Sequence, residues 1–118
     1  MNGDDEEVCE VVITAPDENW LLGFTRHLVE RRLTACGHHT AIRSIYTWNG
    51  VIEDQTETRV ALHTRASCVP AITAITNEQH PYEVPCIIAV PINQASPAYR
   101  AWILAATDPA RTPADADL

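Results

Sequence analysis

Three side chains that commonly bind metals lie in one short segment of the chain: His80, Glu83 and Cys86. Imidazole, carboxylate and thiolate groups suit copper or zinc, and copper ranks above zinc in the usual divalent order. Pro81 and Pro85 lie in the same segment and would also explain it as a structural corner. The segment therefore predicts either a weak copper site formed by His80, Glu83 and Cys86, or a corner with no ligand.

A second candidate metal site consists of Cys36, His38 and His39. Adjacent residues of an extended chain point to opposite faces, so only one of the two histidines can join Cys36 on a given side. His27 and His63 stand alone in the sequence, and an isolated histidine usually has a partner in the core or in solvent. Cys36, His38 and His39 are therefore the second choice of ligands.

No motif in the chain is typical of an enzyme. The sequence contains four glycines and lacks a Gly-x-Ser-x-Gly turn, a glycine-rich phosphate loop and a His-Glu-x-x-His helix. A nucleophile at Cys36 or Cys86 has no supporting pattern around it. We expect no catalysis.

The composition and charge of the chain indicate which classes of partner to expect. Its 118 residues fit one domain, and its net charge is -8, with most of the excess acid near the two ends. All basic residues are arginines and they are scattered, so nucleic acid is an unexpected partner. The four cysteines form no Cys-x-x-Cys pair and no secretion signal is seen, which favours reduced thiols, a cytoplasmic location and no membrane partner.

The first half of the domain begins with a strand. Residues 8–15 are mostly apolar and β-branched, which predicts a central strand buried on both faces. A helix should begin near Pro16 and end near Ala35 or Cys36, with Gly37 as a left-handed cap.

A β-hairpin is expected next. One strand runs from Thr40, Asn49-Gly50 forms a type I′ turn, and a second strand runs from Val51 toward Thr64. This ribbon reaches beyond its sheet and exposes Tyr46 and Trp48, and a second subunit would cover it.

The last third of the domain should contain two helices and an edge strand. Ser67 is the expected N-cap of a second helix that ends at His80. The strand at 84–92 contains two prolines, which are typical of a sheet edge, and Ser96-Pro97 should begin a final helix.

These elements follow the order β-α-β-β-α-β plus a helix, which predicts an α+β split βαβ fold with both long helices on one face of an antiparallel sheet. We place the domain at residues 8–107. The acidic segment 1–7 and the tail 108–118 are expected to be disordered.

Four motifs in order resemble the CutA family of divalent-cation tolerance proteins: Ile13-Thr-Ala-Pro-Asp17, Arg43-Ser-Ile-Tyr-Thr-Trp48-Asn-Gly50, His80-Pro-Tyr-Glu-Val-Pro85 and Tyr99-Arg-Ala-Trp102. The resemblance implies a ferredoxin-like fold, a PII-like homotrimer, a cytoplasmic location and a role in copper tolerance. It also implies copper contacts at a cysteine and a His-His pair, but those positions hold Ile13, Gln79 and His80 here.

Other positions also depart from the family pattern: Cys86 replaces an acid, His63 a lysine, and Gly37-His38-His39 a Val-Asn-Ile segment. The ligands of any bound metal should therefore be rearranged. Two other functions remain open: a PII-like small-molecule sensor, disfavoured by the tight turn at Asn49-Gly50, and an inert trimeric scaffold that binds partners.

Overall fold

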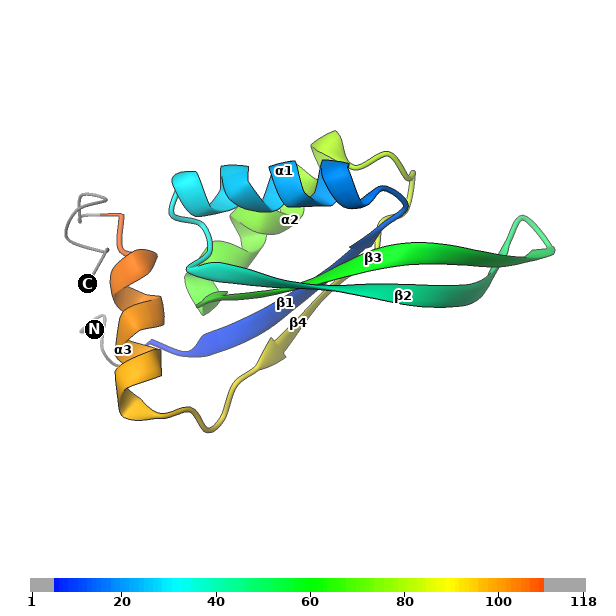
Figure 1. Cartoon of the computed structure of the whole chain (residues 1–118). Coiled ribbons are helices and arrows are strands. Elements are labelled where there is room, and N and C mark those ends of the chain that lie inside the picture. Colours follow the sequence, from blue (N-terminus) through cyan, green and yellow to red (C-terminus); the bar gives the residue numbers. More distant parts are fainter. Residues whose placement is uncertain (1–5, 110–118) are drawn as a thin grey trace.

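The computed structural model describes residues 6–109, and their elements form an α+β fold with one four-stranded antiparallel sheet. In chain order the elements are β1 (Val8–Ala15), α1 (Glu18–Glu30), β2 (Cys36–Trp48), β3 (Val51–Arg65), a 3-10 turn (Ala66–Cys68), α2 (Val69–Gln79), β4 (Ile87–Pro91) and α3 (Pro97–Ala106). The strand order is β2-β3-β1-β4, with α1 and α2 on one face and α3 across one end (Figure 1).

The sheet has the predicted arrangement of strands. β1 lies between β3 and β4, as its apolar sequence predicts, and β4 is an edge strand. β4 is shorter than the predicted 84–92 and spans Ile87–Pro91. Pro85 lies outside the strand and Pro91 is its last residue, which fits a residue without an N–H to donate to the strand ladder.

The core lies between the sheet and the two long helices. Alternate residues of β1, including Val11 and Ile13, meet Leu21 and Leu28 of α1 in a single buried cluster. A smaller cluster holds α3 and contains Ile103 and Leu104 together with Val8 and Ala35. These two clusters fix the positions of β1, β3 and α3 relative to one another, which determines the geometry of the candidate site.

The predicted end of α1 is wrong. The helix ends at Glu30, Arg32 adopts a positive φ of 62°, and Gly37 lies inside β2. Gly37 is required for another reason, since a Cβ atom there would lie 2.5 Å from Cγ2 of Thr25 on α1. The glycine therefore allows α1 to approach the sheet, and β2 begins at Cys36 instead of Thr40.

The predicted cap of α2 is also wrong. Ser67 lies within the 3-10 turn, and Cys68 is the N-cap, without a side-chain hydrogen bond. The backbone N–H of Ser67 instead donates to the carboxylate of Glu6. His80 ends the helix and Ser96 caps α3 as predicted, with its Oγ accepting from the N–H of Tyr99.

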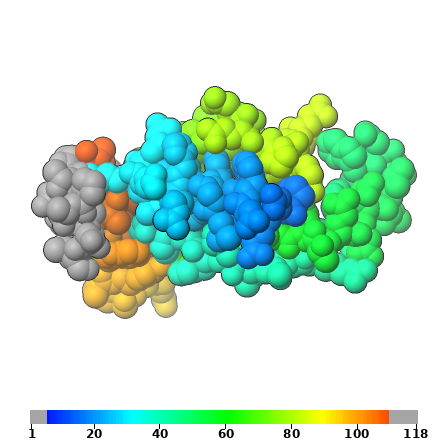
Figure 2. Space-filling model, turned by 45° about the horizontal axis from the view of Figure 1, so that its top comes forward, coloured from blue at the N-terminus to red at the C-terminus, as the bar shows by residue number. Residues whose placement is uncertain are grey.

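The β2–β3 ribbon extends well past the helices. Asn49 and Gly50 have φ values of 51° and 79°, as a type I′ turn requires. Figure 2 shows the green tip of this ribbon standing apart from the helical layer. Large apolar side chains remain exposed on it, among them Ile45 at 70% and Ile52 at 75%.

The ends of the described chain are attached to the domain. Glu6, which we placed in the N-terminal acidic segment, forms an ion pair of 2.8 Å with Arg65. The carbonyl of Asp108, placed in the tail, accepts a hydrogen bond from Arg32. The remaining residues of both segments, 1–5 and 110–118, lie outside the described residues. No helix within residues 6–109 is long and apolar enough to cross a membrane.

Candidate functional site

The pairing of β2 with β3 creates a group of metal-binding side chains. Cys36 lies opposite His63, and His38 lies opposite the next residue but one, Ala61, so all three donors share the sheet face that α1 and α2 do not cover. The ligand atoms of Cys36, His38 and His63 all lie within 4.8 Å of one another. Among residues 6–109, this is the one such group of three donors from His, Cys, Asp and Glu.

His63 is held from both sides of its ring. Its Nε2 lies 2.8 Å from Oε2 of Glu10, on the neighbouring strand β1, and its Nδ1 lies 2.5 Å from the hydroxyl of Tyr99 on α3. The Tyr99 hydroxyl also lies 3.4 Å from Sγ of Cys36. The side chains of His63, Cys36, Glu10 and Tyr99 are all partly buried, whereas His38 is exposed at the edge.

The Glu10 contact fixes which ring nitrogen is available to a metal. A carboxylate accepts hydrogen bonds, so a neutral His63 carries its proton on Nε2, and the lone pair of Nδ1 faces the hydroxyl of Tyr99. A carboxylate behind a histidine orients ligating imidazoles in metal sites in the same way. Glu10 therefore supports His63 as a ligand.

The two adjacent histidines of β2 lie on opposite faces of the sheet. His39 lies opposite Val60 on the helix-covered face, away from Cys36, and burial lowers the pKa of its ring. Burial raises the pKa of Tyr99, so its hydroxyl remains protonated near neutral pH. The structure thus brings together Cys36 and His38 of the second predicted set and leaves His39 on the opposite face.

The first predicted set has a different environment. His80 is only 8% exposed and both ring nitrogens have partners: Nε2 lies 2.7 Å from the carbonyl of Thr14, and Nδ1 accepts from the N–H of Tyr82 at 2.9 Å. Glu83 is exposed and Cys86 is partly buried. His80 therefore closes the corner between α2 and β4.

His63 is the candidate ligand that the sequence analysis did not include, although a signal for it exists. The Asn49-Gly50 turn fixes the register of the hairpin, and counting outward from it without a bulge pairs Cys36 with His63. Cys36 lies outside the predicted strand, which began at Thr40, but inside the observed β2. Glu10 and Tyr99 come from β1 and α3, and no local pattern links them to Cys36.

A cleft of about 780 Å³ lies between the ribbon and the segment 81–86. Its lining includes Arg43, Tyr46, Trp48 and Tyr82. The hydroxyl of Tyr82 donates to Glu57 at 2.9 Å. This cleft is separate from the Cys36 group and lies at the other end of the ribbon.

Comparison with known proteins places the chain in a family. The family model of the CutA1 divalent ion tolerance protein matches residues 9–106. The chain belongs to the CutA1 family. The divalent-cation tolerance protein CutA of Thermus thermophilus is 38% identical over 100 residues, which cover 83% of this chain and 94% of that protein.

Other CutA proteins are also similar to this chain, in sequence or in structure. Mouse protein CutA is 38% identical over 102 residues, covering 86% of this chain and 58% of the mouse protein, so the chain spans little more than half the length of that relative. The CutA1 crystal structure from a psychrotrophic Shewanella has a TM-score of 0.83 at 32% identity, covering 87% of this chain and 97% of that one. The CutA structure from Archaeoglobus fulgidus, described as periplasmic, has a TM-score of 0.83 at 29% identity, covering 86% of this chain and 99% of that one.

Proposed function

We propose that this CutA1 protein is a non-catalytic, homotrimeric divalent-cation binder that contributes to copper tolerance in the cytoplasm. The observation that carries the proposal is the group formed by Cys36, His38 and His63, whose ligand atoms lie within 4.8 Å of one another. Thiolate and imidazole donors suit copper and zinc better than magnesium or calcium. Three protein ligands leave room for a fourth ligand, such as water.

The set His80, Glu83 and Cys86 is the competing location. It requires His80 to give up its contact with Thr14 or Tyr82, and both contacts satisfy polar groups at a buried corner. The Cys36 group requires no break in a backbone contact of this kind. We therefore favour Cys36, His38 and His63 as ligands.

The trimer is supported by the surface that one chain leaves exposed. Trp48 and Val51 of the ribbon are 41% and 57% exposed, and Ile88 of the edge strand is 53% exposed. Exposed apolar groups of this size and an unpaired strand edge favour association with further copies. A homotrimer is the assembly that we propose.

A small-molecule sensor is the second candidate, and the cleft beside Arg43 and Tyr82 is the observation that favours it. Titration calorimetry of one sample with Cu²⁺, Zn²⁺ and ATP separates the functions. The proposal predicts heat with the metals and none with ATP, a sensor predicts the reverse, and an inert scaffold predicts no heat at all.

Single substitutions test which residues bind the metal ion. Cys36→Ser and His38→Ala should each weaken Zn²⁺ binding at least tenfold, because each removes a ligand. Cys86→Ser is the matched control, since Cys86 is also a partly buried free cysteine. Loss of affinity in Cys86→Ser with none in Cys36→Ser would move the site to His80, Glu83 and Cys86.

A further inference from the structure

The hydroxyl of Tyr99 occupies the space between two of the metal-binding atoms. It lies 2.5 Å from Nδ1 of His63 and 3.4 Å from Sγ of Cys36. These are the two atoms that a metal would have to join. The hydroxyl thus contacts both of the atoms that an ion bound to His63 and Cys36 would have to reach.

The contacts around Tyr99 form one directional chain. In a neutral His63 that donates from Nε2–H to the Glu10 carboxylate, Nδ1 accepts from the Tyr99 hydroxyl, whose oxygen can then accept from the Cys36 thiol. Each polar side chain in this series of hydrogen bonds has a partner without a metal. The site is therefore stable when empty, and a metal has to replace hydrogen bonds that already exist.

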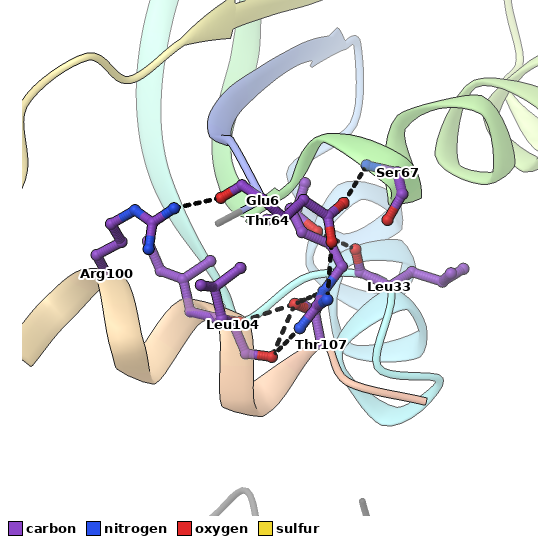
Figure 3. A network of polar contacts seen from close by, with 9 residues as sticks. Glu6, Leu33, Thr64, Ser67, Arg100, Leu104 and Thr107 are labelled. Atoms are coloured by element: carbon purple, nitrogen blue, oxygen red, sulfur yellow. Dashed lines mark hydrogen bonds and ion pairs between the residues drawn. The ribbon is translucent and has the colours of Figure 1, made fainter. Parts of the chain in front are cut away.

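The packing of α3 sets the resting position of Tyr99. Its ring stacks on Trp102, with centroids 5.7 Å apart, and α3 packs through Ile103 and Leu104 in the smaller buried cluster. Arg65 of β3 donates to the carbonyl of Leu104 and to the hydroxyl of Thr107. Figure 3 shows Leu104 and Thr107 within this network of polar contacts at the end of α3. A fixed helix returns the hydroxyl to the same place each time the site empties.

The distances do not allow Tyr99 and His63 to bind one metal together as they stand. Two ligands at about 2.0 Å from a tetrahedral ion lie roughly 3.3 Å apart. The oxygen of Tyr99 and Nδ1 of His63 are 2.5 Å apart, which is a hydrogen-bond distance. The hydroxyl must therefore move before an ion can sit on Nδ1.

We propose that the Tyr99 hydroxyl is a plug that regulates this metal site by competing with the ion for His63 and Cys36. The inference rests on the proposed function. When the ion enters, the hydroxyl swings away with its own proton, the Cys36 thiol releases one proton to water, and the thiolate and Nδ1 bind the ion. The plug lowers the affinity of the site for the metal ion, so the site fills only when free metal is abundant.

Zinc titration of Tyr99→Phe tests the plug. Zn²⁺ is the probe because it does not oxidise thiols. The variant removes the competing hydroxyl and keeps the ring, so its affinity should rise about fivefold, the value of one ordinary hydrogen bond. Tyr82→Phe is the matched control, since Tyr82 is another partly buried tyrosine with a hydrogen bond, to Glu57, and its affinity should not change.

The outcomes separate the two proposals. Equal or weaker binding by Tyr99→Phe, with the wild type binding zinc, overturns the plug and leaves the proposed function intact. No binding by either protein overturns both. The wild type provides a check that needs no variant: the hydroxyl proton of Tyr99 should be visible by NMR without zinc and lost at saturation. A signal that persists at saturation also overturns the plug.

Discussion

Glu10 and His63 lie opposite each other on β1 and β3, with Oε2 of Glu10 2.8 Å from Nε2 of His63. This contact orients the imidazole that the proposed site needs. Arg59, 4.0 Å from the other carboxylate oxygen, adds a cation behind Glu10. The pair links the central strand to the candidate ligands.

Replacing Glu10 should therefore weaken metal binding without removing a ligand. We expect Glu10→Gln to lower Zn²⁺ affinity about tenfold, because supporting carboxylates of ligating histidines typically have effects of this size. Calorimetry measures it, with Glu53→Gln on the exposed ribbon as control. An unchanged affinity in Glu10→Gln would show that His63 does not bind the ion.

His80 should matter for stability. His80→Ala leaves the carbonyl of Thr14 and the N–H of Tyr82 without their partner, which should cost about 1–3 kcal/mol of unfolding free energy. Urea denaturation measures this loss, and Zn²⁺ affinity should stay unchanged. His27→Ala on α1 is the control. A variant that keeps its stability and loses zinc would support the site at His80, Glu83 and Cys86 instead.

The ribbon should hold the proposed trimer together. Trp48→Asp places a charge on a surface that must lose its water on assembly, so the variant should dissociate at micromolar concentration. Light scattering reports the mass, and Asn77→Asp on the exposed side of α2 controls for added charge. A wild-type protein that is monomeric under the same conditions contradicts the trimer itself.

Glu6 should mark the true start of the domain. Its carboxylate accepts from Arg65 at 2.8 Å and from the N–H of Ser67 at 2.9 Å, and its carbonyl accepts from Arg100. Deleting residues 1–5 should leave the melting temperature unchanged. Glu6→Ala should lower the melting temperature and reduce the free energy of unfolding by about 1–3 kcal/mol, because it leaves the buried Arg65 without its anion. Equal melting temperatures for both variants would show that Glu6 contributes nothing.

The carboxylate of Glu6 should also make the stability of the fold depend on pH. Burial raises the pKa of Glu6, but the hydrogen bonds from Ser67 and the contact with Arg65 outweigh it, so the folded-state pKa lies below the ordinary value of 4.5. A lowered pKa stabilises the fold above that value, and this contribution is lost as pH falls through the folded pKa. The stability difference between wild type and Glu6→Gln should therefore shrink below about pH 4.5. A constant difference down to pH 3 would contradict this assignment.

The sequence by itself determined the elements and their order, because those depend on neighbouring residues. The mostly apolar, β-branched run 8–15 predicted a central strand, Asn49-Gly50 predicted the turn that sets the register of the ribbon, and Pro97 marked the start of α3. The C-terminal end of α1 and the cap of α2 were predicted wrongly. In both cases a tertiary contact decided the outcome: the approach of Thr25 to Gly37, and the hydrogen bond from Ser67 to Glu6.

Only the tertiary structure decided the candidate site. His63 looked isolated in the sequence, but strand pairing places it beside Cys36 and Glu10, and the packing of α3 adds Tyr99. His80 looked like a ligand by its type and neighbours, yet folding engages both of its ring nitrogens in hydrogen bonds. The physical reason is the same for both histidines: residue type sets which bonds a side chain can make, and the contacts formed on folding set which of them remain available.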